Sequence, residues 1–418
     1  MNEIFTADEC KVQTSENGVH LHIISMHTSP LAQPGEGDAG GMNVYIDRSL
    51  RALLAEFPQL SVEIFTLAPQ RLKRSCQQVS ERAVVHMIEI EEAFGAKKSE
   101  LPGFIDEFAR RVQQKSRRSP DIIHSHYWLS GLVALQYGED IPVVHTMHTT
   151  AAAKNARAGA GEPHEPAERR RAEQEIVEKC AALVVNTAVE KEQMVRFYAA
   201  DPAKISIIEP GVDTGIFKPV AGEQANHAGS ATSAHLVFAG RPQPLKGPQV
   251  LVEALALLPA DLAVNLTVIG RSDTDFEEQL LARAQELGLE QQVELIPPVS
   301  SRDLAQHFRR ADIVACPSSS ETFGLVALEA QACGTPVIAT DADGLAAAVE
   351  HQRSGVLVAT RDAPDWAQAI EHLVRHPQLR QNLGAFAAQR AARKTWELTA
   401  EHLFELYSSL SKPSFTDR

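Results

Sequence analysis

The sequence predicts an α/β fold of two Rossmann-like, doubly wound domains that face each other across a cleft. Its 418 residues exceed what one hydrophobic core usually spans. Short β-branched runs alternate with amphipathic stretches almost throughout, which indicates parallel sheets covered by helices. A new strand–turn–helix unit opens after a polar stretch at residues 221–234, which indicates a second domain.

The predicted elements divide into two series. In the first half we expect strands at His20–Met26, Val62–Leu67, Val84–Ile90, Asp121–His126, Pro142–Thr146 and Leu183–Asn186, and helices at Met42–Phe57, Leu101–Arg118 and Ala167–Cys180. In the second half we expect strands at His235–Gly240, Leu266–Ile269, Val293–Ile296, Ile313–Ala315, Val337–Ala339 and Val356–Val358, and helical runs at Arg241–Leu258 and Asp365–Leu410. Ligands of open α/β sheets bind beyond the carboxyl ends of strands, so the functional residues should follow strands.

We expect the chain to divide into four segments. They are a flexible tail at 1–18, an N-terminal Rossmann-like domain at 19–215, a C-terminal Rossmann-like domain at 216–395 and a C-terminal helix at 396–418 that packs back towards the N-terminal domain. The tail is polar and acidic and lacks the basic start and apolar middle of a signal peptide.

Composition excludes several classes of protein. With 44% hydrophobic and 22% charged residues and no apolar run of membrane-spanning length, we expect a soluble protein. A net charge of -14 repels nucleic acid and anionic lipid at long range, so an anionic ligand must be held by local cations and backbone amides.

The five cysteines are scattered and form no CxxC pair: Cys10, Cys76, Cys180, Cys316 and Cys333. This pattern argues against a disulfide framework or a structural zinc site. We therefore expect free thiols and a location in the reducing cytoplasm.

A glycine-rich loop, GEGDAGG at residues 35–41, follows the first strand and leads into a helix, which predicts an anion site. Its GxGxxG spacing also matches a nicotinamide-dependent dehydrogenase. That alternative needs an acidic residue where the next strand ends, and this strand ends Thr66-Leu67-Ala68. The loop between His27 and Gly35 is also too long for the tight dehydrogenase turn. A plain surface loop is the other alternative.

Four histidines lie at neighbouring strand ends: His124, His126, His145 and His148. They raise the possibility of zinc binding, but no HExxH motif accompanies them. We expect separate hydrogen bonds for His124 and His145 instead. His148 and Thr149 are expected to face the cleft, where imidazole and hydroxyl groups bond to sugar hydroxyls.

Two cations flank the turn after the strand at residues 235–240. Arg241 follows that strand and Lys246 is expected at the start of the next helix, a spacing that lets both reach one diphosphate. Together they would offset the negative charge on a departing nucleotide. Two solvated surface cations are the alternative.

Two glutamates follow a later strand. Glu321 is expected at a helix entrance, and Glu329 falls eight residues on, about two helical turns down the same face. One carboxylate would hold sugar hydroxyls and the other ribose hydroxyls, with the helix N-terminus directed at the phosphates. A capping glutamate plus an ordinary surface glutamate is the alternative.

These motifs resemble glycosyltransferase family 4. The resemblance rests on the Arg241 and Lys246 pair, on SSSETFGLVALEAQACGTPVIAT and on IIEPGVDTGIFKP. The stretches ISMHTSPLAQPGEGDAGGMNVYI, IHSHYWLSG, HTMHTTAAAKN and FAGRPQPLKGPQVL are similar to the branch that glycosylates inositol phosphate in mycothiol biosynthesis. The resemblance implies a GT-B fold and transfer of N-acetylglucosamine from UDP-GlcNAc to 1D-myo-inositol 3-phosphate, with retention and release of UDP.

Matching motifs carry the family's site residues onto this chain. The implied acceptor site, in the first domain, is His27, Asp38, Ala39, Gly40, Gly41, Met42, Asn43, Lys98, Tyr127, Thr149 and Arg169. The implied donor site is Gln33, Pro34, Gly41, Arg241, Lys246, Glu321 and Glu329, with the Val299 backbone at the uracil. The implied catalytic residues are Arg241, Lys246, His148 and Glu321. Lys97 and Arg170 remain alternatives to their neighbours Lys98 and Arg169.

The resemblance also implies a homodimer and a structural Mg²⁺ ion at Phe308, Arg309, Ala311 and Thr335. Backbone carbonyls would supply most of the ligands, so no cofactor is expected in the chemistry. The alternatives within the family are a sucrose-phosphate-type and a phosphatidylinositol mannosyltransferase-like enzyme. Outside it, a UDP-GlcNAc 2-epimerase or a non-enzymatic sugar-nucleotide sensor would share the architecture.

Overall fold

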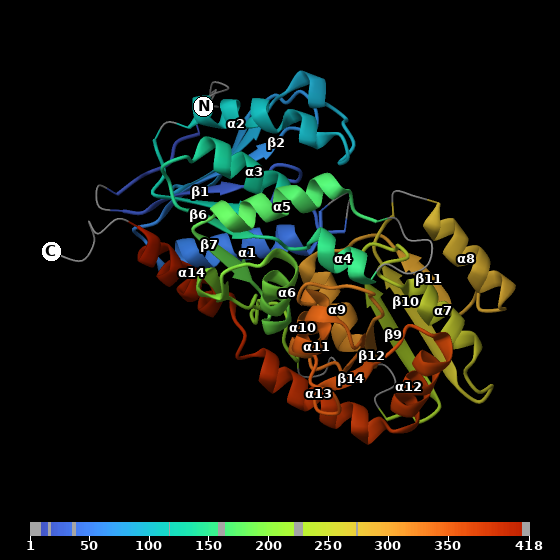
Figure 1. The fold of residues 1–418 in the computed structure, drawn as a ribbon. Helices are drawn as coiled ribbons and strands as arrows, with labels where there is room; N and C mark the ends of the chain where they lie inside the picture. Colours follow the sequence, from blue (N-terminus) through green and yellow to red (C-terminus); the bar gives the residue numbers. More distant parts are fainter. Residues whose placement is uncertain are drawn as a thin grey trace, which may run out of the picture. The chain divides into compact units, whose positions relative to one another are not determined.

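A computed structural model describes residues 10–15, 18–35, 39–116, 118–157, 164–220, 229–272 and 275–411. Contacts divide the chain into two compact units (Figure 1). Unit 1 is Met1–Ala32, Met42–Ile208 and Thr399–Arg418, and unit 2 is Gln33–Gly41 and Glu209–Leu398. Each unit is built around one mainly or wholly parallel sheet with helices, so the predicted α/β class is confirmed.

The sheet of unit 1 has the strand order β3-β4-β2-β1-β5-β6-β7-β8. Its strands are β1 (His20–Ile24), β2 (Ser61–Leu67), β3 (Cys76–Ser80), β4 (Ala83–Ile88), β5 (Ile122–His126), β6 (Val143–Thr146), β7 (Ala182–Val185) and β8 (Ile205–Ile207). All pairs are parallel except β3 with β4. The two edge strands, β3 and β8, were not predicted, because CQQVS is polar and β8 has only three residues.

The α-helices of unit 1 are α1 (Gly41–Glu56), α2 (Ile105–Lys115), α3 (Trp128–Tyr137), α4 (Ala151–Arg157), α5 (Ala167–Lys179) and α6 (Ala188–Tyr198). Short 3-10 turns lie at Glu91–Ala93, Leu101–Phe104 and Pro202–Lys204. The last helix, α14 (Trp396–Leu410, red in Figure 1), also packs on unit 1. Phe404 stacks on Phe57 with ring centroids 3.9 Å apart, and the Tyr407 hydroxyl lies 2.7 Å from Nδ1 of His124.

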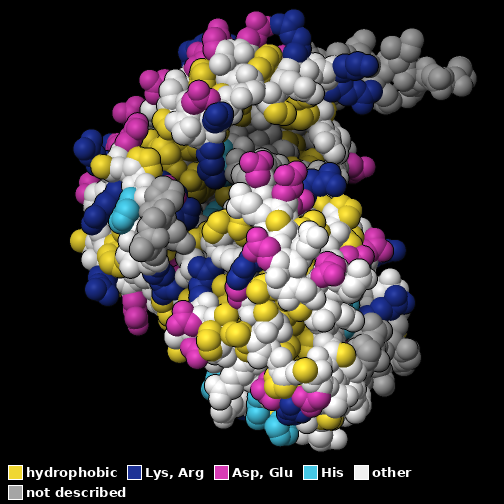
Figure 2. All heavy atoms as spheres, turned by 90° about the vertical axis from the view of Figure 1, so that its right-hand side faces the viewer, with side chains coloured by type: hydrophobic (Ala, Val, Ile, Leu, Met, Phe, Trp, Pro, Cys, Tyr) yellow, Lys and Arg dark blue, Asp and Glu magenta, His cyan; other side chains and the backbone are white. Residues whose placement is uncertain are grey.

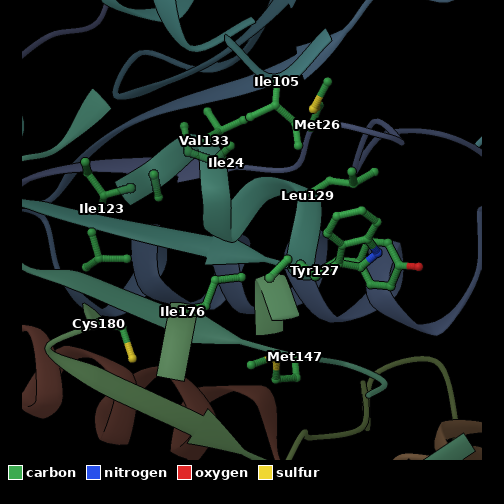
Figure 3. Close-up of a cluster of buried hydrophobic side chains, with 14 of the residues drawn as sticks. Ile24, Met26, Ile105, Ile123, Tyr127, Leu129, Val133, Met147, Ile176 and Cys180 are labelled. Carbon is green, nitrogen blue, oxygen red and sulfur yellow. The ribbon is translucent and has the colours of Figure 1, made fainter. Parts of the chain in front are cut away.

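A buried apolar cluster supports the strand ends of unit 1 (Figure 3). Ile24 at the end of β1 and Met26 just beyond it belong to one buried cluster with Leu129 and Val133 of α3 and Ile176 of α5. α3 and α5 approach closely at a glycine, since a Cβ atom on Gly131 would lie 2.5 Å from Cδ1 of Ile176. This packing places Tyr127, which immediately precedes α3, on a rigid base.

The sheet of unit 2 has the order β11-β10-β9-β12-β13-β14 and is parallel throughout its described pairs. Its strands are β9 (Ser233–Ala239), β10 (Ala263–Ile269), β11 (Val293–Ile296), β12 (Ile313–Cys316), β13 (Val337–Thr340) and β14 (Gly355–Val358). Its helices are α7 (Pro248–Ala256), α8 (Phe276–Glu286), α9 (Ser301–Arg310), α10 (Leu325–Ala332), α11 (Asp343–Ala348), α12 (Ala363–Arg375) and α13 (Pro377–Ala391).

Two predicted helical runs are broken by their backbone chemistry. The run from Arg241 is a loop up to Gly247, whose φ of 79° caps α7, and a proline then takes the first helical position. The run from Asp365 to Leu410 comprises three helices, α12, α13 and α14. The first break follows from Pro377, which lacks an amide hydrogen and disfavours helix in the residue before it.

The expected cysteine chemistry is corrected, and residues 10–15 of the expected flexible tail are held in place. Cys10 and Cys76 form a disulfide bond, and Cys180, Cys316 and Cys333 are buried thiols. Residues 10–15 are also held by a 2.8 Å hydrogen bond from Gln13 N to Glu81 O. The disulfide could not be predicted from the sequence separation of 66 residues, because it forms only when residues 10–15 lie beside β3. Residues 1–9 lie outside the described part of the chain.

The surface mixes both signs of charge. On the face drawn in Figure 2, Lys and Arg side chains lie among Asp and Glu side chains. Among the described residues, no helix is long and apolar enough to cross a membrane.

Candidate functional site

Several predicted residues follow the strands of unit 1 at their carboxyl ends. His27 lies beyond β1, Tyr127 directly follows β5, and His148 and Thr149 lie just beyond β6. Tyr127 and His148 have φ angles of 72° and 58°, in the left-handed region that side chains other than glycine rarely occupy. Such backbone strain is concentrated at functional sites, which makes this edge of the sheet the candidate site of unit 1.

Three side chains converge on the ring of Tyr127. Nζ of Lys98 lies 4.5 Å and Cζ of Arg169 lies 4.8 Å from the ring centroid. The His27 ring centroid is 4.6 Å away. Two cations therefore lie against one aromatic ring, on a chain whose net charge is -14.

Arg169 is only 1% exposed and is held from several sides. Its Nε donates to Glu173 Oε1 at 2.8 Å, and its Nη1 lies 3.0 Å from Glu165 Oε2. Its Nη2 donates to the carbonyl and the hydroxyl of Thr149, at 2.8 and 3.0 Å. Neither carboxylate was predicted from the sequence, although each is four residues from Arg169, a spacing that pairs charges on a helix.

The geometry distinguishes Lys98 and Arg169 from their neighbours. Lys98 is half-buried and Arg169 is buried, whereas Lys97 and Arg170 are exposed. Of these four, Lys98 and Arg169 lie over the ring of Tyr127. We therefore assign Lys98 and Arg169 to the cluster.

Asn43 has a local role in the structure. It is 1% exposed and its Nδ2 donates to Thr28 Oγ1 at 2.9 Å and to the Ser29 carbonyl at 2.6 Å. These bonds hold the turn that follows His27. Met42 is half-buried beside it, and Asp38 lies outside the described residues.

The histidines at the strand ends form hydrogen bonds, as expected for His124 and His145. His124 bonds to the hydroxyls of Tyr407 and Thr146, and His145 lies 2.8 Å from Ser125 Oγ. His126 Nδ1 lies 2.9 Å from His148 Nε2. Burial lowers the pKa of His145 and of His148 to about 3, so both rings are neutral near pH 7.

Part of the glycine-rich loop belongs to unit 2. Gln33 Nε2 donates to the Val299 carbonyl at 3.3 Å, and Gly35 N donates to Ala39 O at 3.0 Å. Gly41 lies against Leu325 of α10, since a Cβ atom there would be 3.7 Å from Leu325 Cδ1. Gln33 and Gly41, both expected to bind the donor, therefore belong to unit 2, as do the other expected donor residues. Pro34 is exposed.

Lys246 and Glu321 form an ion pair in unit 2, and both are about one-quarter exposed, at 27% and 26%. The loop that carries Lys246 is joined to the loop that carries Glu321 by a 2.9 Å hydrogen bond from Ser319 N to Leu245 O. Lys246 lies in this loop and precedes α7, so its expected position at the helix start is corrected. Arg241 directly follows the turn glycine, Gly240, after β9.

The expected relation between Glu321 and Glu329 is also corrected. α10 begins only at Leu325 because Gly324, with a φ of 91°, caps it. Glu321 lies in the preceding loop, where its carbonyl accepts a 2.8 Å hydrogen bond from Gly344 N. The two glutamates are therefore not two turns apart on one helix.

Two of the residues expected to hold Mg²⁺ meet directly. Thr335 Oγ1 donates to the Phe308 carbonyl at 2.6 Å. The carbonyl also accepts from Ala311 N at 3.1 Å. Mg²⁺ prefers oxygen ligands, but both lone pairs of this carbonyl oxygen are engaged in hydrogen bonds within the protein.

The buried histidines predict a loss of stability in acid. A histidine in the unfolded chain takes up a proton near its ordinary pKa of 6.5, whereas His145 stays neutral in the folded chain down to about pH 3. The unfolded state therefore binds more protons below pH 6.5, and the free energy of unfolding falls as the pH drops towards 3. Each such group contributes a slope of up to about 1.4 kcal/mol per pH unit.

Urea denaturation at about pH 7.5 and about pH 5 measures this slope. His145→Asn should flatten it, and His372→Asn, at an exposed position of α12, should leave it unchanged. Equal slopes in the wild type and in His145→Asn would contradict the assignment.

Comparisons with known proteins agree with both units. The model of Glycosyltransferase Family 4 matches residues 39–215, and that of Glycosyl transferases group 1 matches residues 223–390. A D-inositol 3-phosphate glycosyltransferase of Pseudarthrobacter chlorophenolicus is 43% identical over 92% of this chain and 94% of its own. One of Jonesia denitrificans is 42% identical over 92% and 95%.

Solved structures show the same fold. Sucrose-phosphate synthase of Thermosynechococcus elongatus has a TM-score of 0.86 at 27% identity, covering 94% of this chain and 99% of its own. HepE of Anabaena, solved with UDP and glucose, has a TM-score of 0.72 at 18% identity, covering 94% and 100%. The two α/β domains are thus those of GT-B glycosyltransferases, and by its sequence the chain belongs to the family of D-inositol 3-phosphate glycosyltransferases.

Proposed function

We propose that this glycosyltransferase moves N-acetylglucosamine from UDP-GlcNAc to 1D-myo-inositol 3-phosphate and releases UDP, the first step of mycothiol biosynthesis. The relatives' names support the acceptor, and the motifs of both domains support the donor. The observation that carries the proposal is the convergence of Lys98 and Arg169 on Tyr127, because a phosphate dianion needs cationic and hydrogen-bonding partners.

On the acceptor side, Lys98, Arg169 and Thr149 would bind the phosphate. Arg169 is fixed by two carboxylates, so its guanidinium is oriented before the acceptor arrives. Glu165 and Glu173 also neutralise it, so a neutral acceptor would not leave Arg169 as an unpaired buried charge. Selectivity for the phosphate then comes from attraction to Lys98 and Arg169.

On the donor side, Arg241 and Lys246 would stabilise the negative charge that grows on the departing UDP. Lys246 is paired with Glu321. When the donor binds, its diphosphate would replace the Glu321 carboxylate as the partner of Lys246. Glu321 would then be free to bind the sugar hydroxyls. Glu329 would hold the ribose hydroxyls. The donor's own β-phosphate would accept the acceptor proton, with retention on one face of the sugar.

His148 would position the transferred sugar. Its pKa of about 3 keeps the ring neutral near pH 7. A neutral imidazole can form hydrogen bonds with sugar hydroxyls and places no positive charge beside the sugar. The reaction needs no cofactor on this proposal. A structural Mg²⁺ would be held by Phe308, Arg309, Ala311 and Thr335.

We also propose a homodimer that works in the cytoplasm. The buried thiols Cys180, Cys316 and Cys333 agree with a reducing compartment, whereas the Cys10–Cys76 disulfide is unusual there. Light scattering on the purified chain, with and without reductant, tests the dimer.

The direct test of the function is UDP release from UDP-GlcNAc with and without inositol 3-phosphate. We expect release only with both substrates, and a product that retains the α configuration. Release with fructose 6-phosphate would instead support the sucrose-phosphate-type alternative. Conversion of UDP-GlcNAc without an acceptor and without UDP release would support the epimerase.

Lys246→Ala should reduce turnover by roughly 10²-fold or more, because it removes one charge-assisted contact to the leaving diphosphate. Arg283→Ala is the matched control, since it removes an exposed ion pair with Glu253 in the same unit. Circular dichroism verifies that both variants fold. Turnover at the wild-type level in folded Lys246→Ala would remove Lys246 from the mechanism.

Lys98→Ala should lower kcat/KM for inositol 3-phosphate by roughly 10-fold to 100-fold, because a charged hydrogen bond to the phosphate is lost. Its affinity for UDP, measured by calorimetry, should be unchanged, because UDP would contact Lys246 and Glu329. Lys97→Ala, at the exposed neighbour, should behave as the wild type. If the two variants exchanged these phenotypes, Lys97 would be the acceptor ligand.

A further inference from the structure

A second polar cluster lies inside unit 1, away from the residues that follow the strand ends. It comprises His20 and His22 of β1, Glu63 of β2 and His86 of β4. His22 is aligned with Glu63, and His86 with Phe65, so alternation along the strands puts all four side chains on one face of the sheet. His20 is the first residue of β1, so the cluster lies towards the amino ends of the parallel strands.

Three ligand atoms of this cluster form a compact triangle. Nε2 of His20 and Nε2 of His22 are 3.1 Å apart, and they lie 3.1 and 3.5 Å from Oε1 of Glu63. Around a tetrahedral zinc ion with bonds of about 2.0–2.2 Å, neighbouring ligand atoms are roughly 3.3–3.5 Å apart. From this match we propose that His20, His22 and Glu63 bind one Zn²⁺ ion, with water at the fourth position.

The surroundings of the triangle have the pattern that supports metal ligands. Nδ1 of His20 lies 2.9 Å from Ser61 Oγ, and Nδ1 of His22 is bonded to the Tyr137 hydroxyl. A ring that donates its Nδ1–H to an oxygen atom presents an Nε2 lone pair to the metal. The other oxygen of Glu63 is held 2.7 Å from Nε2 of His86. Both imidazoles and the carboxylate are thus oriented before an ion binds.

The chemistry of the site favours zinc over Mg²⁺ and over divalent ions that need six ligands. Imidazole suits zinc, whereas Mg²⁺ prefers an oxygen shell. A six-coordinate ion would need three further ligands in a site whose three protein ligands are at most 5% exposed. The Phe65 ring is 5.1 Å from the His22 ring and 5.0 Å from the His86 ring, so an apolar wall bounds one side. Four-coordinate zinc needs only one further ligand.

The test uses the untagged full chain, stripped with a chelator and dialysed against Zn²⁺ with excess Mg²⁺. Elemental analysis should find one equivalent of zinc, and the midpoint of thermal unfolding should rise by roughly 5 °C at saturation. Co²⁺ in the same site should give the absorption spectrum of a tetrahedral ion. X-ray absorption at the zinc edge should show two imidazoles and one carboxylate in the first shell.

His22→Gln and Glu63→Gln should each lose the bound zinc and the thermal shift. The control is His372→Gln/His376→Gln, which removes a surface histidine pair with ring centroids 4.6 Å apart that could bind zinc adventitiously. Zinc lost in this control, or kept in folded His22→Gln, would overturn the proposal. So would an octahedral Co²⁺ spectrum or the absence of stoichiometric zinc. If neither single variant folds, the first shell seen by X-ray absorption decides.

Discussion

The candidate acceptor site depends on the pairing of the buried Arg169 guanidinium with its carboxylate and carbonyl partners. A charge with 1% exposure is costly unless it is paired, and Glu165, Glu173 and the carbonyl of Thr149 supply its partners. This arrangement joins α5 to the turn after β6 and carries a fixed positive charge to the ring of Tyr127. Glu173 in turn accepts hydrogen bonds from Ala151 N at the start of α4 and from the Tyr198 hydroxyl. The carboxylates that fix Arg169 thus also organise the helices around it.

Around this cation, burial keeps the histidines neutral. His27, His126 and His148 have lowered pKa values, chiefly because of burial, and the charges of Lys98 and Arg169 add to the effect at His27. Among the described residues of this cluster, Lys98, Arg169 and the carboxylates paired with Arg169 carry charge, while the neutral imidazoles supply hydrogen bonds. A neutral polyol ring that bears one phosphate would meet both kinds of group in the proposed acceptor complex.

Local pattern was sufficient to predict the strands that bear the site, because short β-branched runs such as β6 are buried on both faces. Matching motifs also singled out Lys98 and Arg169, which meet at Tyr127, and Lys246 and Glu321, which form an ion pair. Three features could not be predicted from the local sequence pattern. Gly247 and Gly324 delay two helices through left-handed backbone. The Cys10–Cys76 bond joins residues 66 positions apart in the sequence. The His20–Glu63 contact joins residues 43 positions apart, and it forms because β1 and β2 are neighbours in the sheet.

The central claim is that Lys98 and Arg169 recognise the phosphate of the acceptor. It is tested most directly by the ratio of kcat/KM for inositol 3-phosphate to kcat/KM for free myo-inositol. The account predicts that the wild type favours the phosphate by roughly 10²-fold or more, because free myo-inositol lacks the charge-assisted hydrogen bonds to Lys98 and Arg169. It also predicts that this ratio collapses in Lys98→Ala/Arg169→Lys, which keeps a charge beside Glu173 but loses the guanidinium fork. A wild-type ratio near one, or an unchanged ratio in the folded double variant, would contradict it.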